Sequence, residues 1–345
     1  MKNVYFNQGL SFGGDTKPAI NREISTENIG EKAFMCYILQ TRKKQIIKKL
    51  LNEAIKIDSR EKRRQNMTDG QIEEFVMKFI EKKAKRSGLA KNVVAFVKNF
   101  YKSYWLSFEP EVREEPGSML DYLFIEKLKN LWKNGYFSFF ISMVDSKGEP
   151  AGIASRAIIK PNTIFRALKE YGISPDEAKG EYERLTVLFN AYLAVPKESI
   201  GENNAEILRK TTKEYVEGLK IFPDYEIVQV EPWKNGLMER YKQDGWKEIG
   251  ELKSMEIVHD YYKDFETIVA PEKQPPLNLL IRPKNKGQDA VNIEELKTII
   301  EAFYLYYGVE PEMTIKGTGQ NAIDAYMKYA LANVKPDEKS MVKLI

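Results

Sequence analysis

The sequence feature that most constrains the fold is an apolar segment, Leu185 to Val195, that ends at a proline. A continuous apolar run of this length is typical of a strand buried on both faces. Pro196 cannot continue a central strand, because it has no backbone N–H to donate. From Asn203 to Lys220 the apolar positions recur at helical spacing, so we expect a buried strand that turns directly into a helix.

Further strands are expected on both sides of this strand-to-helix unit. The apolar runs Tyr136 to Val144 and Ala151 to Ile159 flank a turn that contains Gly148 and Pro150, which predicts a β-hairpin. The elements expected downstream are a strand over Tyr225 to Val230, a short helix over Leu237 to Gln243, strand-like residues from Trp246 to Ile257 around a turn, and a strand over Leu277 to Arg282. Strands and helices that alternate in this way predict a mixed α/β domain.

Both ends of the chain extend this domain. Met1 to Gly30 is rich in Gly, Asn and Thr and predicts an extended arm. Glu31 to Asp58 predicts a helix, because apolar residues recur at helical spacing in its second half. Thr68 and Gln71 fit a capping box at the start of the next helix. The other helices expected are Gln71 to Arg86, Ala90 to Tyr104, Met119 to Trp132, Asn162 to Glu170, Asn292 to Gly308 and Gln320 to Val334, with a linker over Phe108 to Pro116.

The predicted fold class is therefore α/β, with an added N-terminal helical region and a C-terminal helical pair. We expect four parts along the chain. They are an extended arm over residues 1–30, a basic helical region over 31–117, an α/β domain over 118–285, and a C-terminal helical extension over 286–345.

The counts of cysteine and histidine exclude several kinds of site. The chain has one cysteine, Cys36, and one histidine, His259. An internal disulfide needs two cysteines, and a zinc site built from Cys and His needs about four such ligands. We therefore expect no metal. No apolar run approaches the length of a membrane span, and the first residues show no basic-then-apolar leader, so we expect a cytoplasmic chain and no membrane partner.

From about residue 135 to 282 the order of elements resembles the GNAT family of N-acyltransferases. That family ends its fourth strand with a Val-x-Pro-like step, and a later segment has the form Asn-x-x-Ala-x-x-x-Tyr-x-x-x-Gly-Phe. Val195, Pro196, Tyr241, Gly245 and Trp246 stand where the family has Val, Pro, Tyr, Gly and Phe. The resemblance implies a mixed sheet of GNAT type, in which the fourth and fifth strands are parallel and part from each other.

The resemblance also implies a cofactor, acetyl-CoA or another acyl-CoA. The N-terminus of a helix offers backbone N–H groups and a positive dipole end, and both favour a pyrophosphate. The residues that the resemblance assigns to cofactor binding are Val195, Ser199, Gly201, Asn203 and Asn204. The alternative is an ordinary strand-to-helix connection capped by Asn203 or Asn204.

Two residues are candidates for acid–base catalysis of acyl transfer. Tyr241 stands at the family's tyrosine, which gives a proton to the leaving thiolate, and Glu183 could take a proton from the amine. Tyr241 could instead be an aromatic residue that packs a short helix against the sheet. Glu183 could instead be a solvated charge at the entrance of a strand.

The loop after Pro196 departs from the family pattern, Arg/Gln-x-x-Gly-x-Gly/Ala. Ser199 stands at the position of the arginine, and Ile200 and Glu202 stand where small residues are expected. Gly201 is out of register by one residue. A carboxylate near two phosphates is unfavourable.

The helices of the N-terminal region are strongly basic. From Thr41 to Trp105 there are 18 Lys and Arg residues and 7 Asp and Glu residues, a local net charge of +11. Such a segment predicts contact with nucleic acid or another acidic partner, unless the lysines simply form a solvated face.

Three functions remain open on the sequence alone. The first is a diverged GNAT enzyme, inactive or active, that transfers an acyl group from acyl-CoA to an amine. The second is a non-catalytic structural or interaction protein of a large assembly such as a virus or phage particle, with protein partners or a homo-oligomer and a location inside the virion. The third is a nucleic-acid-associated protein that uses residues 41–105.

Overall fold

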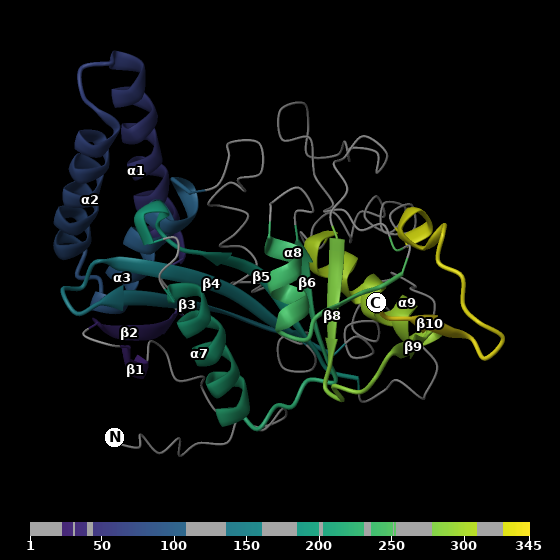
Figure 1. Ribbon diagram of the computed structural model, residues 1–345. Coiled ribbons are helices and arrows are strands. Elements are labelled where there is room, and N and C mark those ends of the chain that lie inside the picture. Colours follow the sequence, from purple (N-terminus) through teal and green to yellow (C-terminus); the bar gives the residue numbers. More distant parts are fainter. Residues whose placement is uncertain are drawn as a thin grey trace. The chain divides into compact units, whose positions relative to one another are not determined.

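The computed structural model describes residues 23–29, 32–39, 44–107, 136–160, 185–199, 203–230, 236–250, 252, 278–308 and 327–345 (Figure 1). The chain divides into two compact units. The first contains the N-terminal residues with Ser138–Arg156 and Tyr192–Ile221, and the second contains Ala157–Ala191 and Phe222–Ile345. Three strands, β3 (Tyr136–Asp145), β4 (Pro150–Ile159) and β5 (Val187–Ala194), have residues in both units.

The larger sheet in the described part has the strand order β1-β2-β3-β4-β5-β6-β8-β7. Besides β4 and β5, its strands are β1 (Glu23–Ile29), β2 (Lys32–Leu39), β3 (Tyr136–Asp145), β6 (Tyr225–Val230), β7 (Lys247–Glu248) and β8 (Asn278–Pro283). The pairs β1–β2, β2–β3, β6–β8 and β7–β8 are antiparallel, whereas β5 and β6 are parallel. The predicted mixed α/β sheet of GNAT type is confirmed.

The first unit places helices on both faces of β3. Its helices are α1 (Lys44–Arg64), α2 (Asp69–Arg86), α3 (Lys91–Asn99), the π-helical turn η1 (Phe100–Trp105), the 3-10 turn η5 (Lys197–Ser199) and α7 (Asn204–Gly218). Successive residues of a strand point to opposite faces. Phe139 packs edge-on against Tyr215 of α7 at 4.9 Å between ring centroids, and the next residue, Phe140, packs against Phe96 of α3 at 5.2 Å. Helices α3 and α7 therefore cover opposite faces of β3.

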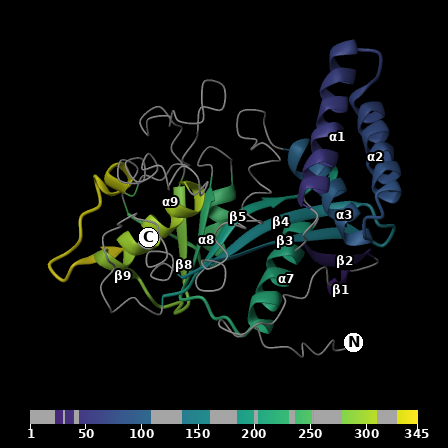
Figure 2. The same ribbon diagram turned by 180° about the vertical axis from the view of Figure 1, so that it is seen from behind.

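Helices α1 and α2 form a hairpin that lies side by side in both views (Figures 1 and 2). The capping box that opens α2 is present: the Thr68 side chain accepts from the Gln71 backbone N–H, and the Gln71 side chain accepts from the Thr68 N–H. A buried ion-dipole contact ties α1 to η1, because the Tyr101 hydroxyl donates to Asp58 at 2.9 Å. The Tyr101–Asp58 hydrogen bond thus holds α1 to η1, and the capping box stabilises the first turn of α2.

The second unit builds on the other end of the sheet. Its remaining elements are α8 (Leu237–Gln243), β9 (Ala290–Asn292), α9 (Ile293–Gly308) and β10 (Met341–Lys343). Phe303 of α9 packs edge-on against Phe189 of β5 at 5.1 Å between ring centroids. The last residues of the chain form a separate two-stranded sheet, in which β10 pairs with β9. The backbone of Ile345 also exchanges two hydrogen bonds with Glu248 of β7 in the larger sheet.

Most of the predicted elements are found where the sequence placed them. Residues Tyr225–Val230 and Leu237–Gln243 form β6 and α8, as predicted. The predicted hairpin is formed by β3 and β4, and the strand-to-helix unit by β5 and α7. The strand-like segment from Trp246 includes β7, and the last predicted strand is β8.

One predicted helix is wrong over a third of its length. The helix expected over Glu31 to Asp58 begins only at Lys44, and Lys32–Leu39 is strand β2, paired with β1 and β3. A short apolar run such as Phe34 to Leu39 cannot be assigned to helix or strand by periodicity alone. Within the predicted arm, Glu23–Ile29 forms β1.

Several predicted segments lie outside the described residues. These are the linker over 108–116, the helices over 119–132 and 162–170, the part of the strand-like segment beyond 252, and residues 320–326 of the helix over 320–334. The described remainder of that helix is helical over 327–331 and ends there. The division of the chain into four parts stays a prediction.

Candidate functional site

The strand pair β5–β6 has the arrangement expected of an acyl-CoA site. The two strands are parallel and paired from Val187 with Tyr225 to Asn190 with Val228. Pairing ends there, although β5 continues to Ala194. At this last pair, the Asn190 side-chain amide donates a hydrogen bond to the Ile227 carbonyl oxygen at 3.4 Å.

The segment after β5 is a tight connection to α7. Pro196 is buried, η5 follows directly, and α7 begins at Asn204. The Ser107 hydroxyl donates to the Val195 carbonyl oxygen at 3.2 Å, which fixes the end of the strand. Residues 200–202 lie outside the described part of the chain.

The first turn of α7 has no side-chain cap. Asn203 occupies the cap position, but its side chain makes no capping hydrogen bond. Its carbonyl oxygen accepts the first helical bond, from Ile207 at 3.0 Å. The first backbone N–H groups of a helix have no partner within the helix. The alternative of a connection capped by the Asn203 side chain is therefore wrong, and among the described residues no side chain caps these N–H groups.

Two buried asparagines hold one peptide group of β4 from both sides. The Gly152 N–H donates to Asn99 Oδ1 at 3.0 Å, and the Ala151 carbonyl oxygen accepts from Asn204 Nδ2 at 3.0 Å. These are the N–H and the C=O of the same peptide bond. Asn204, the first residue of α7, is 1% exposed, and its Oδ1 has no hydrogen-bond partner within the described structure. A buried acceptor left in this state costs about 1–3 kcal/mol unless a ligand or water completes it.

Gly152 permits a close approach of three elements at this point. A Cβ on Gly152 would lie 2.8 Å from Leu208 Cδ1 of α7, 3.2 Å from the Ala194 carbonyl oxygen and 3.3 Å from Val195 Cγ1. The end of β5 and the first turns of α7 can therefore meet β4 only because this residue has no side chain.

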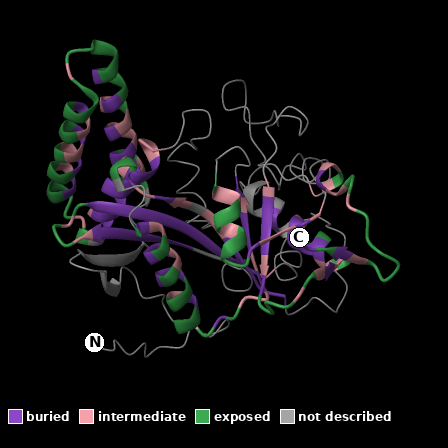
Figure 3. Ribbon diagram, in the orientation of Figure 1, coloured by how far each residue is buried: buried purple, intermediate pink, exposed green. Residues whose placement is uncertain are grey.

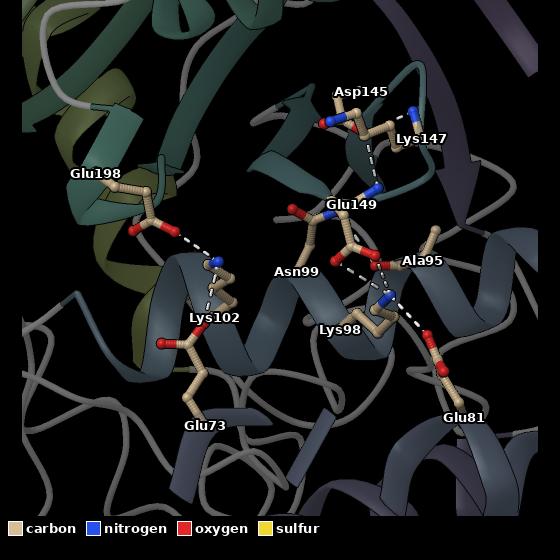
Figure 4. Close-up of polar contacts among 10 residues, drawn as sticks. All are labelled: Glu73, Glu81, Ala95, Lys98, Asn99, Lys102, Asp145, Lys147, Glu149 and Glu198. Carbon is tan, nitrogen blue, oxygen red and sulfur yellow. Dashed lines mark hydrogen bonds and ion pairs between the residues drawn. The ribbon is translucent and has the colours of Figure 1, made fainter. Parts of the chain in front are cut away.

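A lysine of η1 ties the connection to helix α2 (Figure 4). Lys102 Nζ lies 2.5 Å from Glu198 of η5 and 3.0 Å from Glu73 of α2. Burial lowers the pKa of Lys102, but hydrogen bonds to Glu198 and Glu73 outweigh it and hold that pKa above its usual value. For Glu198, burial raises the pKa, and the hydrogen bond from Lys102 together with backbone hydrogen bonding reverses this and holds it below its usual value.

A second lysine repeats this arrangement one turn earlier (Figure 4). Lys98, with 7% of its side chain exposed, lies 2.9 Å from Glu81 of α2 and 3.3 Å from Glu149 of the β3–β4 turn. The Asp145 carboxylate accepts the backbone N–H groups of Lys147 and Glu149 and so fixes that turn. Each of these two lysines is thus shared by two carboxylates, so neither group supplies net positive charge to the connection after β5.

The structure places the predicted site residues unevenly. Val195, Asn203 and Asn204 lie together at the strand-to-helix connection, with the backbone of Ser199 in η5. Gly201 and Glu183 lie outside the described residues. Sequence reasoning missed Asn99, Lys102 and Gly152, which contact this connection from other parts of the chain.

Tyr241 belongs to the second unit, where it packs on the sheet. It contacts a core cluster of Val228, Val230, Trp246 and Leu280, and its ring meets that of Trp246 edge-on at 5.6 Å between centroids. The Arg282 guanidinium lies over the Trp246 ring, 4.9 Å from its centroid. The same guanidinium pairs with both carboxylate oxygens of Glu226 at 2.7 Å. The ring of Tyr241 therefore packs the short helix against the sheet, as the alternative expected. The role of its hydroxyl as a proton donor stays a prediction.

The comparisons with known proteins found acetyltransferases among the solved structures, all at low sequence identity. No protein-family model and no curated protein matches the sequence. Among solved structures, nourseothricin acetyltransferase is 12% identical with a TM-score of 0.25, over 42% of this chain and 65% of that chain. The Naa50 of Arabidopsis thaliana, in complex with the bisubstrate analogue CoA-Ac-MVNAL, is 12% identical with a TM-score of 0.25, over 41% of this chain and 71% of that chain. The Naa20 of Chaetomium thermophilum, also with a bisubstrate analogue, is 13% identical with a TM-score of 0.33, over 54% of this chain and 80% of that chain.

Because these TM-scores lie below 0.5, we base the fold type on the strand pairing of this chain. The fold is of the GNAT type, in a diverged form.

The described residues lack a metal site and a membrane-spanning helix. They contain no group of three or more His, Cys, Asp or Glu side chains that could hold a metal ion. None of the described helices is both long and apolar enough to cross a membrane.

Proposed function

We propose that this chain is an acyl-CoA-dependent N-acyltransferase that binds its cofactor at the connection between β5 and α7. One observation carries the proposal: β5 leaves its parallel ladder with β6 at Asn190 and leads through Pro196 into a helix whose first turn has no side-chain cap. Bare N–H groups at the start of a 15-residue helix favour a phosphate group.

The residues present fit an acyl-CoA in two respects. The uncapped N–H groups of α7 suit the pyrophosphate, and the unpartnered Asn204 Oδ1 suits an N–H donor such as an amide of the pantetheine arm. When bound, acyl-CoA supplies an activated acyl group as a thioester. Asn99 and Asn204 hold β4 against this connection, and Tyr241 is proposed, on the sequence pattern, to hold at Oη the proton that the leaving sulfur takes up.

Calorimetric titration with acetyl-CoA tests the binding step. We expect a dissociation constant in the micromolar range, a free energy of binding of about −8 kcal/mol. For the chemical step, Tyr241→Phe is expected to slow acyl transfer about 10²- to 10⁴-fold while acetyl-CoA affinity stays unchanged. A Tyr241→Phe enzyme with full turnover would exclude this tyrosine as the acid.

A second candidate function rests on the charges of the connection. Glu198 lies in η5, and Lys102, the cation beside it, is already shared with Glu73. This net negative charge disfavours a pyrophosphate. It favours a non-catalytic protein that uses the GNAT fold as an interaction part of a larger assembly. Such a protein gives no heat with acetyl-CoA and runs as a defined oligomer or with bound partners in size-exclusion chromatography with light scattering.

A further inference from the structure

The outer face of the α1–α2 hairpin carries basic side chains that pair with no carboxylate among the described residues. On α1 these are Lys49, Lys56 and Arg63, all exposed, and we call these three the basic face. None of the three forms an ion pair in the part of the chain that the structure describes. Arg63 Nε instead donates a hydrogen bond to the backbone oxygen of Ser59 at 3.2 Å.

The carboxylates of the hairpin are engaged elsewhere. All but Asp69 are in ion pairs within the described structure, and these pairs are Glu53 with Lys83, Asp58 with Lys62, Glu61 with Arg60 and Arg64, Glu73 with Lys102, Glu74 with Lys78, and Glu81 with Lys98. The excess of cations therefore falls on the outward side, where three more exposed residues of α2, Lys82, Lys85 and Arg86, also have no ion pair among the described residues.

The spacing of the basic face makes it a straight row. Its members follow one another at seven-residue intervals, so they lie on nearly one side of α1. At 1.5 Å per residue they are about 10 Å apart and span about 21 Å along the helix axis. The opposite side of α1 is buried through Ile47, Leu51 and Ala54, which fixes the direction in which the row faces (Figure 3).

We propose that the basic face binds the sugar–phosphate backbone of a nucleic acid, independently of base sequence. A straight row of uncompensated cations about 21 Å long matches a linear polyanion with regularly spaced charges. A membrane surface fits less well, because a helix that lies in a bilayer interface needs a free apolar side, and that side of α1 is buried in the protein.

Helix α2 carries an exposed aromatic residue beside cations of its own. Phe75 has 46% of its area exposed, and Lys82 and Arg86 follow it at seven and eleven residues, on the same side of the helix. Exposed aromatic rings beside cations stack on unpaired bases. The phosphate backbone is common to single strands and duplexes, so the test compares both.

Fluorescence anisotropy with a labelled oligonucleotide of about 30 nucleotides, single-stranded or duplex, tests the proposal between about 50 and 200 mM salt. The test variant is Lys49→Gln/Lys56→Gln/Arg63→Gln. The matched control is Lys210→Gln/Lys213→Gln/Lys297→Gln, which removes the same net charge from exposed, ion-paired lysines of α7 and α9. Circular dichroism on both variants verifies that they fold.

We expect the native chain to bind with a dissociation constant of about 10⁻⁴ to 10⁻⁶ M at physiological salt. The test variant should bind duplex about 10²-fold more weakly at 0.1 M salt, with a salt slope smaller by about 3. The control variant should keep the native slope. Phe75→Ala should weaken binding of the single strand more than that of the duplex.

Several results would overturn the proposal. They are no binding at about 50 mM salt, an equal loss in the control variant, or an unchanged slope in the test variant. Binding to anionic vesicles or to polyglutamate, without binding to either oligonucleotide, would assign the surface to a membrane or an acidic protein instead. All of these outcomes are independent of acetyl-CoA binding.

Discussion

Substitution of Gly152 by alanine tests the close approach on which the strand-to-helix connection depends. The new Cβ would lie 2.8 Å from Leu208 Cδ1 and 3.2 Å from the Ala194 carbonyl oxygen. The Leu208 side chain is fully buried and Ala194 contributes backbone, so neither can move without displacing packed neighbours. Overpacking of this kind costs typically about 1–3 kcal/mol, and we expect Gly152→Ala to lower the free energy of unfolding by about 2 kcal/mol.

Urea denaturation followed by circular dichroism measures this change. We expect a lower midpoint with an unchanged slope, because the surface exposed on unfolding stays the same. Gly70→Ala is the matched control: a Cβ there meets nothing within 4 Å, and alanine in a helix is favoured over glycine by about 0.5–1 kcal/mol. If Gly152→Ala is as stable as the native chain while Gly70→Ala gains stability as expected, the close packing of β4, β5 and α7 is refuted.

Three further predictions follow from the polar contacts around this connection. Lys98→Met should lower the free energy of unfolding by about 1 kcal/mol or less, because it removes a buried cation from two carboxylates that are each more than half exposed, whereas Lys82→Met, which breaks no ion pair among the described residues, should change it little. Asn99→Leu should cost about 3 kcal/mol in urea unfolding, since several buried groups lose their hydrogen-bond partner, and an unchanged midpoint would contradict this. Lys102 holds the pKa of Glu198 below its unfolded value of 4.5, so the ion pair stabilises the fold fully above pH 4.5 and stops doing so as the pH falls through the lower folded pKa. In Glu198→Gln, the free energy of unfolding should therefore depend less on pH in that acid range. A pH dependence equal to that of the native chain would contradict this prediction.

The local elements could be predicted because their signals are local. The capping box of Thr68 and Gln71 and the apolar run of β6 each specify their structure within a few residues. Strand β2 was missed because its apolar run is short and stands next to a helical pattern. Strands β9 and β10 have three residues each, too few for any periodicity, and they form only because the end of the chain returns to pair there.

The candidate site was found only in part, because half of it comes from distant parts of the chain. Val195, Asn203 and Asn204 stand next to the proline that ends β5, so the strand-to-helix pattern indicates them. Asn99 reaches Gly152 across 53 residues of sequence, and Ser107 reaches Val195 across 88. No spacing rule in a single sequence predicts such contacts, since they depend on how α3 and η1 pack against the sheet.

Hydrogen–deuterium exchange with and without acetyl-CoA is the most direct test of acyl-CoA binding at the start of α7. We predict that saturating acetyl-CoA slows exchange of the backbone amides in the first turn of α7, from Asn204 onward, because these N–H groups have no helical partner without the cofactor. Helix α9, in the second unit, serves as the internal reference. Unchanged exchange at the first turn of α7 under saturating acetyl-CoA would contradict the account, whatever happens elsewhere in the chain.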